Sequence, residues 1–185
     1  MISTAARKGK TVTEKTIRVE LGERSYDVRI GPGMLTQLGA AAVALDGVTA
    51  AVVICDSNVA KLYGPQATES LRQAGLATET IDFPAGEAHK TLATCGALFD
   101  KLFSVRPAVD RRTLIVAAGG GVTGDVAGFV AATALRGLRW IQCPTTLLAD
   151  VDASVGGKTA VDHPRAITSS ARSTSRAACS STSRR

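Results

Sequence analysis

The sequence predicts an α/β fold, in which a parallel sheet with helices on both faces is preceded by an antiparallel hairpin. From Ala50 onward, short apolar runs alternate with segments of helical periodicity, the order from which parallel sheets are built. The apolar runs are continuous, as in strands that are buried on both faces. The loops between them are only a few residues long, as in crossover units. The expected strands are residues 50–55, 78–83, 112–118 and 138–143.

The hairpin is expected near the start of the chain. Polar and apolar residues alternate over Thr16–Leu21 and again over Tyr26–Ile30, with Gly22 between the two runs. Apolar residues then recur at helical spacing in residues 34–42, 59–71, 92–103 and 126–133. We expect a single α/β domain, residues 16–165, after a flexible N-terminal segment, residues 1–15.

The last twenty residues have a different composition. Of residues 166–185, ten are Ser or Thr and four are Arg, and none is acidic or aromatic. Such a stretch buries too little apolar surface to offset the entropy lost on ordering. We therefore expect residues 166–185 to be disordered.

The charge distribution argues against a nucleic-acid partner. The chain has 185 residues and a net charge of +6, and the four arginines of residues 166–185 account for +4 of it. The remaining residues carry only +2 and show no basic stripe interleaved with aromatic side chains. A hydrophobic fraction of 45% and a charged fraction of 21% are typical of a soluble globular protein.

The cysteines and the hydropathy pattern indicate the cellular compartment. The four cysteines are widely spaced and form no C-x-x-C pair, which favours reduced, buried thiols in a cytoplasmic protein. The most apolar window, residues 40–55, is interrupted by Asp46 and Gly47, so we expect no segment that spans a membrane.

The glycine run Gly119–Gly121 is the motif around which the sequence is organised. It follows an expected strand and precedes a helix, so backbone N–H groups and the positive end of a helix dipole meet at one point, where a phosphate can approach closely. With Gly124 the run spells G-x-G-x-x-G, although a plain glycine turn gives the same letters. The usual Rossmann plan does not transfer, because at least three strand-like runs precede the motif and no acidic residue closes the run 138–143.

Polar residues collect at the carboxyl ends of the expected strands, where parallel sheets bind ligands. In chain order they are Asp56 and Asn58, residues 85–90, residues 119–125, and Thr145 with Thr146. Glu87 and Lys90 suit a ribose and a pyrophosphate, but Glu87 could equally favour the start of a helix.

A second glycine motif lies near the end of the predicted domain. Residues 154–159 end in G-K-T like a phosphate-binding P-loop, but the position that needs the first glycine is Asp152. This argues against a nucleoside triphosphatase. Lys158 and Asp152 then provide a cation and a carboxylate that suit a phosphorylated, hydroxyl-rich substrate. The simpler alternative is a surface lysine beside a glycine turn.

Two further features have simple alternatives. Arg136, at the end of the central helix, could bind substrate or merely complement the helix dipole. His89 and His163 are not spaced as metal ligands, and no third ligand accompanies them, so we expect no complete metal site within this chain.

Taken together, these motifs resemble a known enzyme family. The strings RSYDVRIGPG, CDSNV, PAGEAHK, GGGVTGDVAGFVAATALRG and QCPTTLLADVDASVGGKTAVDHP make residues 17–165 similar to 3-dehydroquinate synthase. The resemblance implies an NAD-dependent lyase of the shikimate pathway that converts 3-deoxy-D-arabino-heptulosonate 7-phosphate into 3-dehydroquinate and phosphate. It also implies that the full-length enzyme is a homodimer and binds zinc or cobalt in a C-terminal all-α domain.

The resemblance assigns roles to individual residues. NAD contacts are implied at Asp56, Asn58, Glu87, Lys90, Gly120, Gly121, Val122, Asp125, Thr145 and Thr146. Substrate contacts and catalysis are implied at Arg136, Asp152 and Lys158, with Lys158 also close to the nicotinamide.

The sequence departs from the family at three places. Ala85 stands where the family often has Asp, and Asp150 adds a charge near Asp152. After Arg165 the family's Gly-Lys-Asn element and metal ligands do not follow, and the tail reads like an out-of-frame version of the family sequence. We therefore expect a truncated NAD-binding half that lacks the all-α domain and is inactive by itself. Two alternatives remain, another sugar-phosphate cyclase of the 2-deoxy-scyllo-inosose or valiolone synthase type, and a non-catalytic nucleotide-binding module.

Overall fold

The computed structural model describes residues 13–22, 25–153, 156, 158–163, 166–172 and 176–181. The strands are β1 (Lys15–Val19), β2 (Tyr26–Gly31), β3 (Ala50–Asp56), β4 (Ala77–Phe83), β5 (Thr113–Gly119), β6 (Trp140–Pro144), β7 (Lys158–His163), β8 (Ala166–Arg172) and β9 (Arg176–Ser181). The α-helices are α1 (Leu38–Val43), α2 (Ser57–Leu62), α3 (Gly64–Gln73), α4 (Leu92–Ser104) and α5 (Gly121–Thr133). Shorter helical turns lie at Met34–Gln37, Glu87–His89, Ala134–Arg136 and Ala149–Ala153.

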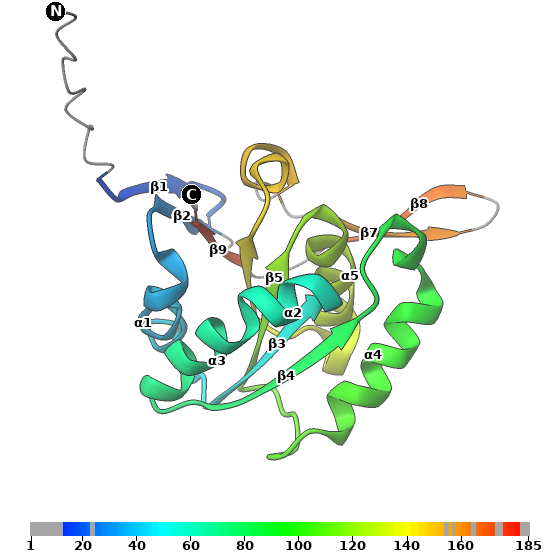
Figure 1. The fold of residues 1–185 in the computed structure, drawn as a ribbon, viewed down its shortest axis with the longest axis horizontal. Helices are drawn as coiled ribbons and strands as arrows, with labels where there is room; N and C mark the ends of the chain where they lie inside the picture. The colour runs from blue at the N-terminus through cyan, green and yellow to red at the C-terminus, as the bar shows by residue number, and fades with distance from the viewer. Residues whose placement is uncertain are drawn as a thin grey trace, which may run out of the picture.

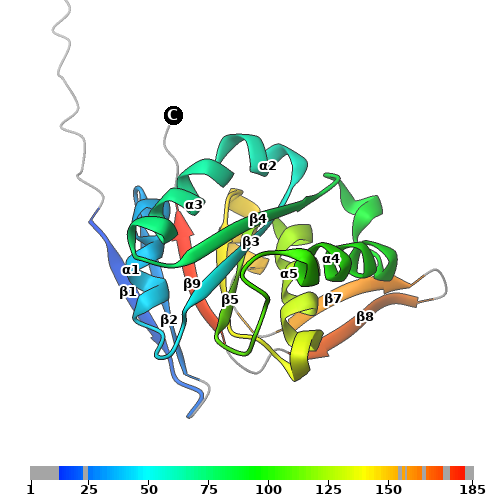
Figure 2. The same ribbon diagram turned by 90° about the horizontal axis from the view of Figure 1, so that it is seen from below.

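A mixed sheet forms the centre of the molecule (Figure 1). Its strand order is β1-β2-β9-β6-β5-β3-β4, and every pairing is parallel except that of β1 with β2. The predicted fold class and the antiparallel hairpin are therefore confirmed. Strands β7 and β8 form a separate antiparallel pair that lies along α5 (Figure 2).

Helices cover both faces of the sheet because the strand residues alternate between two apolar clusters. On one face, Val53 and Val116 pack against α1, α2 and α3 through residues such as Leu71. On the other face, Ile54 and Ile115 pack against α4 and α5. Residues of β3 and β5 are buried on both faces, which is why these strands are continuous apolar runs in the sequence.

The close packing of α5 depends on two glycines of that helix. A Cβ atom on Gly128 would collide with Thr159 and would lie 2.9 Å from Trp140 Cη2, and one on Gly124 would lie 3.2 Å from Gln142 Cδ. These contacts hold α5 close to β6 and β7, so these glycines serve packing rather than ligand approach.

The prediction of a disordered tail is wrong for two segments of it. The backbone of residues 166–172 forms β8, which pairs with β7, and that of residues 176–181 forms β9 between β2 and β6. Composition does not reveal the reason, which is that the edges of β2 and β6 offer main-chain hydrogen-bond partners to any strand between them. The remaining parts of the two terminal segments, residues 1–12, 173–175 and 182–185, lie outside the described residues.

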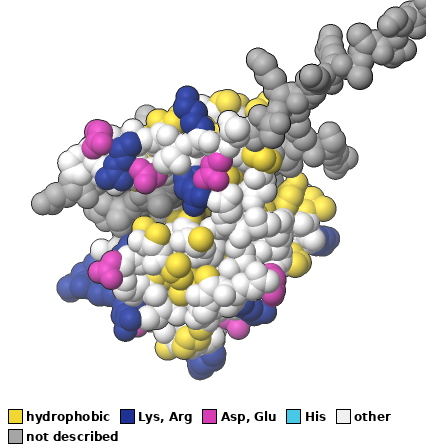
Figure 3. Space-filling model, turned by 90° about the vertical axis from the view of Figure 1, so that its left-hand side faces the viewer, with side chains coloured by type: hydrophobic (Ala, Val, Ile, Leu, Met, Phe, Trp, Pro, Cys, Tyr) yellow, Lys and Arg dark blue, Asp and Glu magenta, His cyan; other side chains and the backbone are white. Residues whose placement is uncertain are grey.

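The segment expected as one helix over residues 59–71 is divided into α2 and α3. The break falls at Tyr63, and Pro65 lies in the first turn of α3, where its missing N–H costs no helical hydrogen bond. No helix in the described part of the chain is long and apolar enough to cross a bilayer. On the face shown in Figure 3, acidic and basic side chains are interspersed rather than gathered by sign.

Candidate functional site

The carboxyl ends of the central parallel strands lie level with one another. The register pairs Asp56 at the end of β3 with Phe83 at the end of β4, and Gly119 at the end of β5 with Pro144 at the end of β6. Between them, Cys55 of β3 pairs with Ala118 of β5. The polar residues that follow these ends in the sequence therefore lie along one edge of the sheet, as the sequence predicts.

The glycine turn at the centre of this edge is open to a ligand. Gly120 precedes the first turn of α5 in an extended conformation, and among the described residues a Cβ atom there would meet only Thr146, at 3.6 and 3.7 Å. The first-turn N–H groups of α5, from Gly121 to Thr123, precede the first helical hydrogen bond of α5, which Gly124 N–H donates to Gly120 O. The turn thus combines accessible backbone donors with the positive end of a helix dipole, which suits a phosphate.

Asp56 has a structural role in this edge. Its Oδ1 accepts hydrogen bonds from the backbone N–H groups of Asn58, at 2.9 Å, and Val59, at 3.1 Å, and so caps α2. Its Oδ2 accepts a hydrogen bond from Thr123 Oγ1 at 3.2 Å. The Asn58 side chain is exposed on the first turn of α2.

Lys90 and Asp125 form an ion pair beside the glycine turn. The Lys90 Nζ lies 2.7 Å from Asp125 Oδ2, and the two side chains are 15% and 27% exposed. Burial alone would lower the pKa of Lys90, but the hydrogen bond and charge of Asp125, with smaller contributions from Asp162 and Glu87, raise it above its usual value. Lys90 is therefore a permanent cation at this edge at neutral pH.

Two other contacts fix the loop that carries Lys90. Ala85 N–H donates to Ser57 Oγ at 3.2 Å, which attaches the start of the loop to α2. Asp162 N–H donates to Lys90 O at 2.8 Å, and Thr91 forms a β-bridge with Asp162, which attaches its end to β7. The side chain of Glu87 is exposed between these two attachments.

The loop after β6 completes the edge. Thr145 N–H donates to Gly119 O at 3.0 Å, so this loop begins directly beside the glycine turn. Thr146 begins the next helical turn, where its Oγ1 accepts from Ala149 N–H at 3.2 Å. Thr145 thus lies beside Gly119 and Thr146 beside Gly120, both at the carboxyl edge of the sheet.

Arg136 does not lie at this edge. It follows the C-terminal end of α5, and the thirteen residues of that helix separate it from the glycine turn by about 20 Å. Leu135 and Arg136 have positive φ angles of 49° and 70°, which are unusual for residues other than glycine. Arg136 is exposed there and lines a shallow hollow with Asp110 and Arg111.

The other two predicted substrate residues are placed by their backbones alone. Near the start of β7, Thr159 packs on Gly128 of α5. Near its end, Asp162 N–H donates to the carbonyl of Lys90, whose side chain contacts Asp125 in the first half of α5. Strand β7 therefore runs antiparallel to α5. Lys158 therefore starts β7 at the end farther from the glycine turn, and Asp152 lies in the turn Ala149–Ala153. Their side chains lie outside what the structure describes.

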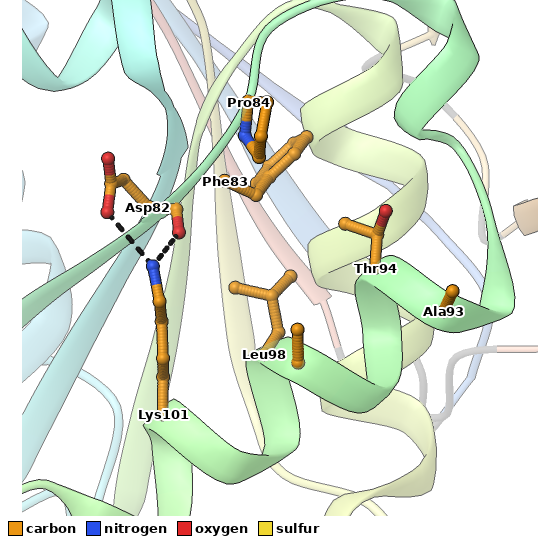
Figure 4. Close-up of a pocket in the computed structure, with 8 residues that line it drawn as sticks. Asp82, Phe83, Pro84, Ala93, Thr94, Leu98 and Lys101 are labelled. Carbon is orange, nitrogen blue, oxygen red and sulfur yellow. Dashed lines mark hydrogen bonds and ion pairs between the residues drawn. The ribbon is translucent and has the colours of Figure 1, made fainter.

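A separate hollow of about 270 Å³ lies between β4 and α4 (Figure 4). Its lining is largely apolar, with Phe83, Pro84 and Leu98 among the residues, and Lys101 at its rim donates to Asp82 O at 2.5 Å and Asp82 Oδ1 at 3.2 Å. None of the residues predicted to contact NAD or substrate is among those that line it.

The described residues fit a dinucleotide better than a metal ion. The open glycine turn and Lys90 suit a pyrophosphate. Within residues 13–22, 25–153 and the described parts of the later strands, no group of three His, Cys, Asp or Glu side chains is placed to hold a metal ion. No chemistry of a metal is therefore assigned to these residues.

Sequence reasoning missed three residues that shape this edge. Ser57 and Asp162 anchor predicted residues, and Gln142 packs against Gly124. Thr123 lies within the predicted range 119–125, but the sequence does not predict its contact with Asp56. The three missed residues contact residues far away in the sequence.

Comparison with known proteins identifies the relatives of this chain. Residues 80–168 match the model of the 3-dehydroquinate synthase N-terminal family. Over 151 residues the chain is 52% identical to the 3-dehydroquinate synthase of Pelotomaculum thermopropionicum, and over 148 residues it is 49% identical to that of Symbiobacterium thermophilum. The two alignments take in 82% and 80% of this chain but 40% and 41% of the synthases, so the chain spans about 40% of their length.

Solved structures of related cyclases share the fold. A 2-deoxy-scyllo-inosose synthase complexed with carbaglucose-6-phosphate, NAD+ and Co2+ superposes with a TM-score of 0.81 at 28% identity, covering 90% of this chain and 44% of that one. A 2-epi-5-epi-valiolone synthase from Streptomyces hygroscopicus subsp. jinggangensis, with NAD+ and Zn2+ bound, gives 0.67 at 27% identity, covering 87% and 44%. Like the synthase relatives, these proteins are longer than this chain.

Proposed function

We propose that this chain is the NAD-binding part of a 3-dehydroquinate synthase. The observation that carries the proposal is the open glycine turn at Gly120, where accessible backbone N–H donors lie close to a cation, Lys90. The sequence around this turn is 52% identical to that of a 3-dehydroquinate synthase. The activity that the full-length enzyme would have is the conversion of 3-deoxy-D-arabino-heptulosonate 7-phosphate into 3-dehydroquinate and phosphate.

Each residue of the edge suits a part of the dinucleotide. The N–H groups of Gly121 and Val122 would bind the pyrophosphate, and Lys90 would offset its charge. Asn58, Glu87, Thr145 and Thr146 supply side-chain oxygens and an amide for ribose hydroxyls. When bound, NAD+ supplies a hydride acceptor, and the contribution of this chain is to bind and orient it.

The substrate-binding roles of Asp152, Lys158 and Arg136 stay predictions. Arg136 lies at the far end of α5, so a substrate contact from it is not made at the edge described above. The homodimer, the cytoplasmic location and the lack of turnover by this chain alone also stay predictions. Phosphate release from the purified chain, given substrate, NAD+ and zinc, would measure the last of these.

A related sugar-phosphate cyclase is the second candidate, favoured by the high structural similarity to 2-deoxy-scyllo-inosose synthase. Identity to that protein is 28%, whereas identity to the P. thermopropionicum synthase is 52%. The difference favours the 3-dehydroquinate synthase assignment.

Titration calorimetry with NAD+ tests the proposal on the chain as it exists. Gly120→Ala suits the test because the fold has room for its Cβ, which would project into the space that a phosphate needs. We expect the unchanged chain to bind NAD+ and the variant to bind about tenfold or more weakly, since a methyl group prevents close backbone approach. Gly96→Ala is the matched control and should bind NAD+ unchanged, because Gly96 lies in α4 rather than in the glycine turn and no atom of the described residues lies within 4 Å of its Cβ. Absence of NAD+ binding by the unchanged chain, or equal affinity in Gly120→Ala, would overturn the proposal.

A further inference from the structure

Thr123 is a buried polar residue in the first turn of α5. Its side chain is 1% exposed, although it lies within the motif that opens to a ligand. A buried hydroxyl needs a hydrogen-bond partner, and the partner of Thr123 Oγ1 is Asp56 Oδ2, at 3.2 Å. This contact joins α5 to Asp56, the last residue of β3 and the N-cap of α2.

The hydrogen bond from Thr123 determines how Asp56 can lie. Because Asp56 Oδ1 already accepts from Asn58 N–H and Val59 N–H, the two oxygens of one carboxylate connect two helix N-termini. A carboxylate held at both oxygens cannot rotate freely. The orientation of the first turn of α2, which carries Asn58, is therefore tied to the first turn of α5.

Gly119 locks the other side of Thr123. A Cβ atom on Gly119 would collide with Thr123 Oγ1 and Cβ and would lie 2.8 Å from its Cγ2, so the threonine occupies the space that only a glycine leaves. The side chain is thus confined between the end of β5 and Asp56. Its rotamer, and with it the direction of the hydroxyl, is set by packing.

We propose that Thr123 is a positioning residue of the dinucleotide site. It touches no ligand itself. Through Asp56 it holds the first turn of α2 in register with the glycine turn, so that both parts of the site face the same dinucleotide. The effect on NAD+ binding rests on the proposed function, whereas the hydrogen bond between Thr123 and Asp56 does not.

The experiment compares Thr123→Val, which keeps the shape and removes the hydroxyl, with Thr123→Ser, which keeps the hydroxyl. Thr113→Val is the matched control. Thr113 is 2% exposed, lies at the opposite end of β5, and its Oγ1 donates to Asp110 Oδ1 at the same 3.2 Å. The same Oγ1 also accepts from Asp110 N–H at 3.1 Å. Thr113→Val therefore removes at least as much hydrogen bonding as Thr123→Val, at a site away from the carboxyl edge.

Two readouts are measured on the full chain. Amide hydrogen exchange at Asn58 and Val59 reports whether the Asp56 carboxylate is still held, without any ligand. NAD+ titration reports the consequence for binding. In Thr123→Val we expect exchange about three- to tenfold faster and NAD+ affinity lower by a similar factor, the range of one hydrogen bond. Thr123→Ser should restore both, and Thr113→Val should change neither.

The outcomes separate the two proposals. Unchanged exchange at Asn58 and Val59 in Thr123→Val would overturn the positioning role. Faster exchange with unchanged NAD+ affinity would show that the link is structural only and would also overturn it. If the unchanged chain binds no NAD+, the proposed function fails, and exchange alone then decides whether Thr123 holds Asp56.

Discussion

Lys90 keeps its positive charge in a setting that water reaches only in part. Its carboxylate partner, Asp125, offsets the cost of burial, and the exposed pair Lys101–Asp82 provides the natural contrast, since both of its side chains are about half exposed. Ion pairs at exposed sites contribute little to stability, whereas a hydrogen-bonded pair shielded from water contributes more.

Asp125→Asn should lower the free energy of unfolding by about 1–2 kcal/mol at pH 8, because Lys90 then keeps the cost of burial without its counter-charge. The folded-state pKa of Lys90 lies above its ordinary 10.5, so the stabilisation is complete below about pH 10 and is lost as the pH rises through the folded value. Urea unfolding at pH 8 and pH 11 should therefore show a difference between the two proteins that shrinks at the higher pH. The control Asp82→Asn should cost no more than about 0.5 kcal/mol. An equal effect of the two substitutions would contradict the argument.

The buried thiols give a second prediction at the residue scale. Burial, with the nearby charges of Asp82 and Asp56, raises the pKa of Cys55 to about 12, and burial raises that of Cys95 to about 11. Since the thiolate is the reactive form, neither residue should be alkylated by iodoacetamide in the folded protein at pH 8. Peptide mapping by mass spectrometry should show labelling at both only after unfolding in urea. Labelling of either in the native state would mean that its strand or helix opens readily.

At the scale of the elements, α5 packs closely against β6 and β7 because Gly124 and Gly128 leave room for the side chains of those strands. Gly128→Ala places a methyl group against Thr159 and Trp140, and overpacking of this kind costs about 1–3 kcal/mol. Gly96→Ala, in the open part of α4, should instead stabilise by about 0.4–1 kcal/mol, since alanine favours a helix. Thermal and urea unfolding of the two variants should move in opposite directions. A neutral Gly128→Ala would show that α5 can shift away from β7.

The sequence could predict those elements whose signal is local. Buried strands such as β3 and β5 are continuous apolar runs, and their carboxyl ends follow from parallel order, so Asp56, Lys90 and the glycine run could be assigned to one edge. The division of α2 from α3 was also visible in principle, because Pro65 marks the start of a helix.

Other features depend on contacts between distant residues and could not be predicted. The anchoring of Lys90 by Asp162 joins two parts of the chain that no short motif connects. The position of β9 depends on the unpaired main-chain groups of β2 and β6, between which it lies, rather than on its own composition. The resemblance implies a substrate contact for Arg136, which α5 separates from the glycine turn, and that contact stays a prediction.

For the whole molecule, β9 is the only described link by strand pairing between the β1–β2 hairpin and the rest of the sheet. A chain shortened to end at Arg172 should therefore unfold at a lower temperature and expose two unpaired edges, which favour association between molecules. A chain that ends at Ser181 keeps β9 and serves as the control. Differential scanning calorimetry and light scattering measure the two effects. If the shorter chain has the thermal midpoint of the control, then β9 contributes nothing to stability, and residues 173–181 are dispensable.

The attachment of Lys90 to β7 also has a consequence for the order in which the protein assembles. The start of the loop before α4 is attached to Ser57, which precedes it in the chain. The carbonyl of Lys90 accepts its hydrogen bond from Asp162, so the end of the loop is attached only when this much later segment has been synthesised and packs along α5. Closing so long a loop costs entropy that is recovered only when the distant contact forms. The core strands β3, β4 and β5 are complete well before that point. A nascent chain would thus contain the complete strands β3, β4 and β5 before the end of the Lys90 loop could be attached to β7.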